Sequence, residues 1–378
     1  MTTTPDAAVA PAPAPGWRIA TLRGVPVYLG RSWPIVALVI VATFGPSITR
    51  ALPGLGAGAY LVAVAYALLL LGSVLAHEAG HALVAQRFGH RVDAIVADLW
   101  GGHTTYQAHT NTPGRSALVA VAGPLANAVL AVVAYLAWPH VTHDVTALLV
   151  GALYYSNAFV AVFNLLPGLP LDGGFLVDSL VWKATGSRTT GQIVAGWTGR
   201  VVTLGVVAWF VVLPLLRGET PDLFSIMWMA LIASFLWQGA TAAIAGARAQ
   251  RAINTVDPRT LVRPTHLVPA TATLAQVAAD GIPAGTVAIT TDPTGRPVGV
   301  LGDAVSQVPS HLWATTPVSA VTVALPAAAV VDWRDDLTTT DLLTAMARAD
   351  IGACLVHDVP TGTYGFVAGQ DVEQALGA

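Results

Sequence analysis

The stretch VLAHEAGHALVA, residues 74–85, places two imidazoles and a carboxylate in an otherwise apolar segment. Because His77 and His81 are four residues apart, a helix would present both on one face, where their neutral nitrogens could bind one zinc ion. Glu78 could then reach a water at the metal without being a ligand, as in HExxH hydrolases. A pair of core histidines is the alternative interpretation. An ionisable group inside a membrane span costs about 3 kcal/mol unless it is paired, which favours the metal.

The composition around this stretch is that of a membrane protein. Of the 378 residues, 54% are hydrophobic and 10% are charged, and the mean hydropathy is +0.64. Apolar runs long enough to cross a bilayer about 30 Å thick lie near residues 33–50, 58–86, 116–138, 145–166, 195–216 and 223–246. We therefore predict a polytopic α-helical membrane protein with about six transmembrane helices. The net charge of −3 and the low content of Lys and Arg argue against nucleic-acid binding.

The sequence divides into three parts. Residues 1–15 are rich in Pro and Ala and predict a disordered tail. Residues 16–250 hold the apolar runs and also a segment, 89–112, that alternates as short strands do and is too polar to cross the bilayer as a helix. This segment predicts a small membrane-associated β region. Residues 256–378 are soluble in character and predict a C-terminal, cytoplasmic α/β domain.

A third metal ligand is expected in the stretch NLLPGLPLDGG, residues 164–174. A catalytic zinc site takes three protein ligands and keeps one position open, and the apolar runs contain few acids. The two prolines of the stretch prevent a regular helix and its two glycines permit tight turns. Since irregular backbone is tolerated at membrane depth beside a cavity, the stretch could carry Asp172 into the bundle. The alternative is an ordinary loop with a solvated Asp at the membrane surface.

Together, the two stretches resemble the motifs of the site-2 protease family of intramembrane zinc metalloproteases. GGHTTY, residues 101–106, is similar to the membrane-associated strand of that family, and GPLAN, residues 123–127, is similar to its small-residue helix. The resemblance covers roughly residues 17–246. It implies a zinc metalloendopeptidase that hydrolyses peptide bonds of transmembrane protein substrates within the lipid bilayer.

The resemblance also implies roles for individual residues. One zinc ion per chain would be held by His77, His81 and Asp172, with Glu78 as the general base. Asn164 would hold the substrate carbonyl or oxyanion. Gly101 and Gly102 would belong to the strand against which an unwound substrate pairs.

Two other functions would use the same polar residues. An ion or metal transporter would use them as a cation relay and would be expected to contain inverted repeats, which the six runs do not show. A non-catalytic metal-binding membrane scaffold would complete four protein ligands, and three are evident in the sequence.

Residues 256–378 resemble a tandem pair of cystathionine-β-synthase-type (CBS) domains, which are regulatory or dimerising modules. Residues 336–376 fit best, with Asp371 at the acidic position that contacts ribose in nucleotide-binding members. Ala368 stands where those members carry a threonine, and the first half has Val305 at its acidic position. The resemblance implies a regulatory or dimerising pair, through which a homodimer could form. The departures at Ala368 and Val305 predict weak or absent adenine-nucleotide binding.

The distribution of basic residues predicts the orientation in the membrane. The basic residues of one side are Arg18, Arg23, Arg31, Arg87, Arg91, Arg115, Lys183, Arg188, Arg248 and Arg251. Arg50 and Arg217 flank the other side. By the positive-inside rule, both termini of this multi-pass cell-membrane protein are cytoplasmic.

This orientation can be tested by cysteine labelling. In a protein without Cys354, single cysteines in the N-terminal tail and at Thr142 should react from opposite sides with a membrane-impermeant maleimide, because Thr142 lies in a loop on the outer side. Labelling of both positions from the same side of sealed vesicles would refute the six-span orientation.

Overall fold

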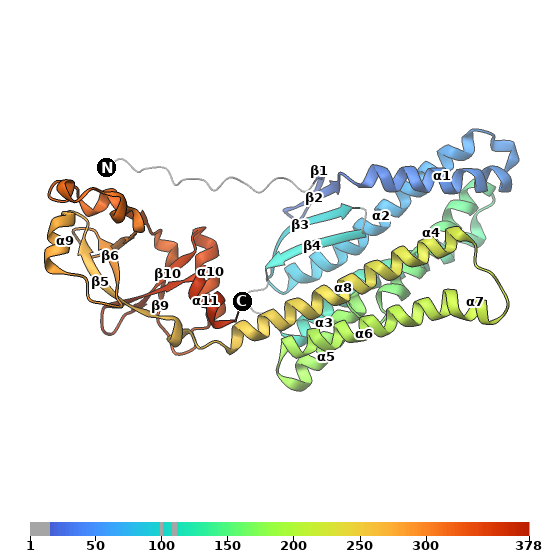
Figure 1. Ribbon diagram of the computed structural model, residues 1–378. Coiled ribbons are helices and arrows are strands. Elements are labelled where there is room, and N and C mark those ends of the chain that lie inside the picture. Colours follow the sequence, from blue (N-terminus) through green and yellow to red (C-terminus); the bar gives the residue numbers. More distant parts are fainter. Residues whose placement is uncertain (1–15, 99–100, 108–111, 378) are drawn as a thin grey trace. The chain divides into compact units, whose positions relative to one another are not determined.

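The computed structural model describes residues 16–98, 101–107 and 112–377. The predicted disordered tail, residues 1–15, lies outside the described residues. The chain forms two compact units, Met1–Ala247 and Arg248–Ala378. The first holds the apolar helices and a small sheet, and the second holds a larger sheet with short helices (Figure 1).

Six helices among the described residues are long and apolar enough to cross a membrane, which confirms the predicted fold of the first unit. They are α1 (Trp33–Ala51), α2 (Gly58–Arg87), α3 (Pro113–Ala137), α4 (Asp144–Asn164), α6 (Arg188–Val207) and α8 (Leu223–Thr255). Helix α6 continues through a π-helical segment (Ala208–Val212) into α7 (Leu213–Leu216). These six helices are assigned as membrane spans by their length and composition.

The structure differs from the sequence prediction between α4 and α6. Helix α5 (Asp172–Thr185) was not predicted, because its mixed polarity gives no span signal. It ends at Gly186, whose positive φ of 72° favours glycine. Helix α6 begins at Arg188 rather than near residue 195, because the Ser187 side chain caps it by accepting a hydrogen bond from the Thr190 amide.

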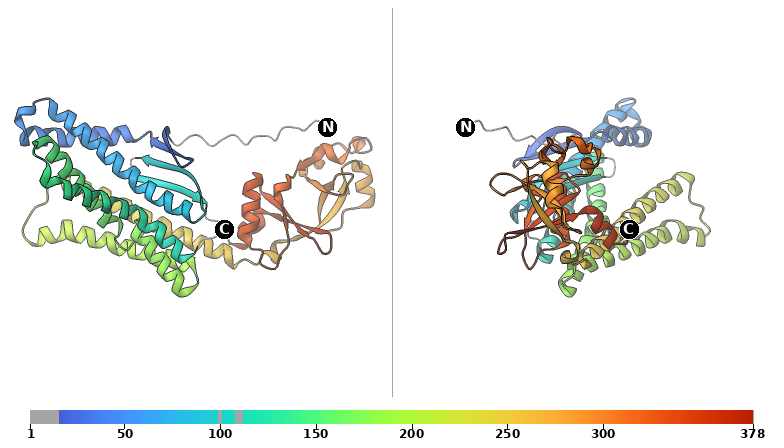
Figure 2. Two further views of the ribbon diagram at one scale, coloured as in Figure 1. Left: turned by 180° about the vertical axis from the view of Figure 1, so that it is seen from behind. Right: turned by 60° about the vertical axis from the view of Figure 1, so that its left-hand side comes forward.

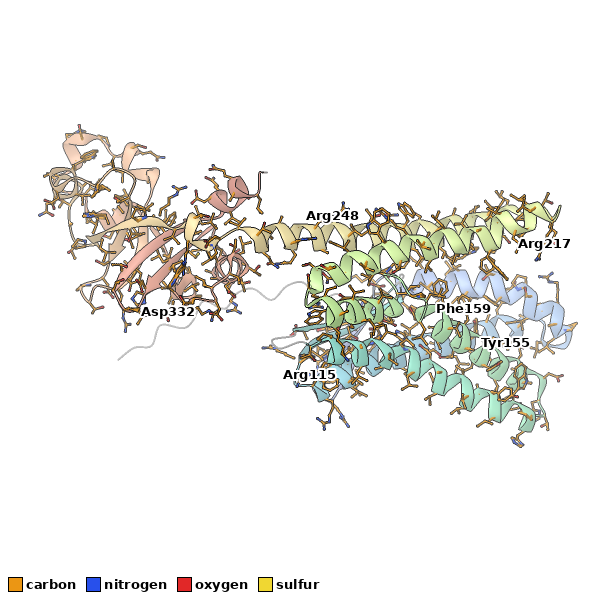
Figure 3. The ribbon with its side chains drawn as sticks, turned by 90° about the horizontal axis from the view of Figure 1, so that it is seen from below. Arg115, Tyr155, Phe159, Arg217, Arg248 and Asp332 are labelled. Atoms are coloured by element: carbon orange, nitrogen blue, oxygen red, sulfur yellow. The ribbon has the colours of Figure 1, made fainter. Side chains whose placement is uncertain are left out.

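Helices α6, α7 and α8 form a long hairpin. The loop that joins α7 to α8 stands apart from α1 and α2 in the right-hand view of Figure 2. Seen from below, Arg217 at this loop and Arg115 at the start of α3 lie at opposite ends of the membrane unit (Figure 3). Small residues allow the close contacts of this hairpin: a side chain at Gly196 of α6 would overlap Ile244 of α8, and one at Gly239 of α8 would overlap Pro170 in the stretch before α5.

A four-stranded sheet accompanies the helices, with strand order β1-β2-β3-β4. Its strands are β1 (Gly16–Leu22), β2 (Val25–Gly30), β3 (Arg91–Asp98) and β4 (Gly101–Gln107). The hairpin β1–β2 closes through Arg23 and Gly24, both with positive φ, as a two-residue turn between twisted strands requires. Strands β2 and β3 are parallel, and β3 and β4 are antiparallel.

The sheet packs on the last turns of α2. Val27 and Ile95 of the sheet and Ala82 and Ala85 of α2 belong to one buried cluster. The alanines let the strands approach the helix closely. Because β4 is the last strand in the order, this packing leaves an edge of the sheet beside α2.

The second unit is an α/β domain built on a seven-stranded sheet of order β8-β7-β6-β5-β11-β10-β9. Its strands are β5 (Arg263–Pro269), β6 (Val287–Thr291), β7 (Pro297–Leu301), β8 (Thr322–Ala324), β9 (Val330–Asp332), β10 (Ala353–Asp358) and β11 (Thr363–Ala368). Its helices are α9 (Leu274–Asp280), α10 (Thr339–Ala349) and α11 (Gly369–Ala375).

The two halves of this domain repeat one pattern. In each half, two parallel neighbouring strands are connected by a helix, and a third strand pairs antiparallel with the second. The two halves are β5-α9-β6-β7 and β9-α10-β10-β11. Each helix begins with a threonine capping box, at Thr273 and at Thr338. After its third strand, the second half has α11, whereas the first has a short 3₁₀ helix, Asp303–Gln307.

Cys354 lies in the core of the second half with no exposed surface. Burial raises the pKa of its thiol to about 12. Since the thiolate is the reactive form, this cysteine should contribute little to labelling near neutral pH.

Candidate metal centre

Three donor side chains converge inside the membrane unit. His77 and His81 project from one face of α2, and Asp172 is the first residue of α5. Nε2 of His77 lies 3.1 Å from Nε2 of His81 and 3.0 Å from Oδ2 of Asp172. Nε2 of His81 lies 3.4 Å from Oδ1 of Asp172. The three predicted ligands thus meet at one point.

The irregular stretch before α5 delivers Asp172. Leu169 lies between α4 and α5, and its amide donates to the carbonyl of Ala195 in α6 over 3.0 Å. A Cβ at Gly173 or Gly174 would overlap the backbone of this same stretch. The two glycines therefore allow the chain to fold back on itself at the point where α5 begins, and the link to α6 fixes where the Asp172 carboxylate lies.

The hydrogen bonds of the two imidazoles define their tautomers. Nδ1 of His77 lies 2.6 Å from Oδ1 of Asn127, and Nδ1 of His81 lies 2.7 Å from the carbonyl of Val119. Asn127 Nδ2 is already donating to Asn157 Oδ1, so its Oδ1 is an acceptor. Both Nδ1 atoms must then donate, which leaves both Nε2 atoms with lone pairs.

These donors fit a zinc ion. Two Nε2 lone pairs 3.1 Å apart cannot hydrogen-bond to each other and face a carboxylate whose Oδ2 has no hydrogen-bond partner. Two imidazole nitrogens and a carboxylate oxygen form a common ligand set for catalytic zinc. Gly123 keeps the space open, because a Cβ there would overlap the Nε2 atoms of both histidines.

A buried amide network holds His77. Asn127 and Asn157 are 1% and 0% exposed, and their side chains join over 2.7 Å. Asn157 Nδ2 also donates to Oγ of Ser73 and to the carbonyl of Leu153. Every polar group of this network has a partner, as burial in an apolar bundle requires. The network therefore fixes the His77 ring from the side opposite the metal.

Glu78 points to the edge of the small sheet. It is 5% exposed, and its Oε2 accepts a hydrogen bond of 2.8 Å from Oγ1 of Thr104 in β4. A Cβ at Gly102 would overlap the Glu78 side chain. Strand β4 therefore positions this carboxylate beside the metal ligands, and its glycine makes the close approach possible.

A cavity of about 510 Å³ connects these groups. Its lining includes the three donors, Glu78, Gly102 and Asn164, which is the last residue of α4. Gly101 begins β4 opposite Asp98. The structure thus brings Asn164 and Gly102 to the same cavity as the metal ligands.

Four polar residues of the site have roles that the sequence did not reveal. Asn127 belongs to the GPLAN motif and Thr104 to GGHTTY, yet neither was assigned a contact. Ser73 and Asn157 were not singled out. Ser73, Asn127 and Asn157 are polar residues inside apolar spans. This pattern could have identified them from the sequence, because a polar residue in a span needs a partner.

The chain has six apolar helices, and one cavity brings together its HExxH histidines and a carboxylate that is distant in sequence. This combination is characteristic of the class of membrane-embedded zinc metallopeptidases. The family model described as "Peptidase family M50" matches residues 65–144 and 139–207. The "Putative zinc metalloprotease sll0528" of Synechocystis is 31% identical over 271 residues, which is 70% of this chain and 69% of that one. The chain belongs to peptidase family M50.

Other relatives are more distant or match over less. Rip3 of Mycobacterium tuberculosis, a protein of the same description, is 34% identical over 54% of this chain and 53% of its own length. The site-2 protease of Methanocaldococcus jannaschii is 21% identical, with a TM-score of 0.43, over 60% of this chain and 94% of that one. A CBS domain of a bacterial CNNM/CorC magnesium transporter is 17% identical, with a TM-score of 0.26, over 36% and 90%.

The amide network predicts a change in metal affinity. Asn127→Leu should lower zinc affinity by about 10- to 100-fold, because it removes the acceptor that orients His77. Chelator competition with the purified protein measures this.

Ser156→Ala is the matched control, since Ser156 lines the same cavity and donates to the carbonyl of Leu153 in its own helix. Wild-type zinc affinity in Asn127→Leu would contradict the positioning role of the network.

Proposed function

We propose that this metalloprotease cleaves peptide bonds of transmembrane proteins with one zinc ion per chain, held by His77, His81 and Asp172. The observation that carries the proposal is the convergence of two imidazole lone pairs and a carboxylate at a cavity between apolar helices. Metal at such a site polarises a carbonyl and makes water a better nucleophile. A membrane-embedded cavity gives access to substrates that soluble proteases do not reach.

Glu78 is the proposed general base. Its Oε2 accepts the Thr104 hydroxyl, so Oε1 is the oxygen free to take a proton from the attacking water. Glu78 then returns this proton to the leaving amine nitrogen, which completes the hydrolysis. The hydrogen bond to Thr104 holds the carboxylate in place through both steps.

Asn164 is the proposed oxyanion donor. It ends α4 and lines the cavity together with Asp172. A side-chain amide at this position can donate an N–H to the oxygen on which negative charge develops.

Strand β4 is the proposed docking strand for the substrate. It stands at the end of the strand order, and Gly102 lies against Glu78. A helical peptide bond is shielded by its own backbone, so a substrate must unwind before it is cut. An extended segment could pair with β4 near Gly101 and Gly102 as an added strand, which would place its peptide bonds beside the base.

The other two candidate functions lack comparable support. A structural metal site would complete four protein ligands, whereas the fourth potential donor here, Glu78, is held by Thr104. A transporter needs no base beside its metal ligands.

We infer further that both termini are cytoplasmic, because most Arg residues flank that side.

The second unit is proposed to be a CBS-like pair that regulates or dimerises the enzyme. The repeated β-α-β-β pattern of its halves supports this. Arg263 forms an ion pair with Asp371, and the Ala368 amide donates to the same carboxylate over 3.2 Å. These contacts engage both Asp371 oxygens, so a ribose hydroxyl at this position would have to share the carboxylate with Arg263 and the Ala368 amide.

Substitution of the base separates chemistry from metal binding. Glu78→Gln should retain zinc yet lower turnover by about 100-fold or more, because the amide cannot accept a proton. His77→Ala and Asp172→Ala should instead lose zinc. Metal content and cleavage of candidate single-span membrane proteins are measured on the same preparations.

Glu219→Gln is the charge-matched control, since Glu219 lies in the loop after α7. Full turnover in Glu78→Gln would overturn the mechanism.

Nucleotide binding is tested by calorimetry of the full chain with ATP, ADP and AMP. We expect no affinity in the micromolar range, because the Thr hydroxyl is absent at Ala368 and Arg263 holds Asp371. Arg263→Gln, which removes that ion pair and leaves the Asp371 carboxylate in place, is the comparison variant. Micromolar binding by the wild type would show that the site is open to nucleotides.

A further inference from the structure

Arg200 lies in the apolar hairpin at a position that the metal centre does not use. It is the one charged residue between Arg188 and Arg217, in a helix long and apolar enough to cross the membrane. An arginine in such a helix is costly unless its charge is compensated or its side chain reaches the headgroup region.

Two tryptophans flank the Arg200 guanidinium. Its Cζ lies 4.6 Å from the ring centroid of Trp197 and 5.0 Å from that of Trp237. Nη2 donates to Oγ1 of Thr241 over 3.1 Å, whereas Nε is buried and has no hydrogen-bond partner. The two rings are 49% and 41% exposed. The cluster therefore faces outward from the hairpin rather than into the metal cavity.

No counter-charge comes from the part of the chain that the structure describes. Within it, the ion pairs of carboxylates involve other cations, and the guanidinium has a neutral hydroxyl as its hydrogen-bond partner. Cation–π contacts offset part of the charge but do not neutralise it. The arginine thus keeps a positive charge and unused donors on an outward surface.

The depth of Arg200 follows from both helices of the hairpin. The 17 residues from Arg200 to Arg217 span about 26 Å at 1.5 Å per residue. The 15 residues from Asp222 to Trp237 span about 22 Å by the same rise. With a hydrocarbon core of about 30 Å, the cluster lies near the headgroup region opposite the loop between α7 and α8.

We propose that Arg200, Trp197, Trp237 and Thr241 form a binding site for the phosphate of an anionic phospholipid. The guanidinium fork matches phosphate oxygens, and the tryptophans suit the zone between headgroup and acyl chains. The lipid phosphate supplies the counter-charge that the described protein lacks. The site also ties this lipid to the contact between α6 and α8.

The test counts lipids bound to the full chain. Purified protein in detergent is titrated with phosphatidylglycerol or phosphatidylcholine of identical acyl chains, and bound copies are counted by native mass spectrometry. The wild type should bind phosphatidylglycerol about fivefold more tightly, as one interfacial arginine provides. Arg200→Gln should abolish this preference, Arg200→Lys should weaken it because an ammonium lacks the guanidinium fork, and Arg217→Gln at the opposite end should leave it unchanged.

A second pair of variants keeps the arginine in place. Thr241→Asp puts a carboxylate beside the guanidinium and should remove the preference, whereas Thr241→Asn should not. An unchanged preference in Thr241→Asp or Arg200→Gln would show that Arg200 is a structural contact between helices. Displacement of phosphatidylglycerol by millimolar inorganic phosphate would overturn the lipid assignment in favour of a free anion.

Discussion

The repulsion between two imidazole lone pairs is the constraint on which the membrane unit depends. His77 and His81 turn their Nε2 atoms toward each other at 3.1 Å because their Nδ1 atoms donate elsewhere. The carboxylate of Asp172 adds negative charge at the same point. A cation at this point would attract both lone pairs and the carboxylate, and so would offset the repulsion among them. The surrounding fold can be understood as the means of keeping these donors in that unfavourable arrangement.

Neighbouring elements each restrain the orientation of one donor side chain. The amide network fixes one ring, the carbonyl of Val119 fixes the other, and the link from Leu169 to Ala195 fixes the carboxylate. Strand β4 restrains Glu78 through Thr104. Gly123 and Gly102 contribute by having no side chain where one would fill the site. These contacts restrain the ligands through groups other than the metal, which lowers the cost of binding it.

The sequence was sufficient where the signal is local. Four-residue spacing on α2 predicted the two histidines, and long apolar runs predicted the six helices that the structure contains. The amide network could not be predicted, because His77 and Asn127 are 50 residues apart and Asn157 and Ser73 are 84 apart. Such contacts depend on how the helices pack. Helix α5 escaped prediction for a related reason: its polar residues Asp178 and Ser179 are buried by tertiary contacts, which its mixed polarity does not reveal.

The link between Leu169 and Ala195 has a consequence for biosynthesis. The histidines are in place once α2 has formed, but the stretch that carries Asp172 finds its hydrogen-bond acceptor in α6. A Cβ at Gly168 would overlap Gly199, and one at Gly199 would overlap Leu169, so this contact forms when α6 packs. A growing chain that has inserted α2, α3 and α4 holds two histidines without a fixed third donor. Completion of the donor set is thereby delayed until most of the membrane unit has been synthesised.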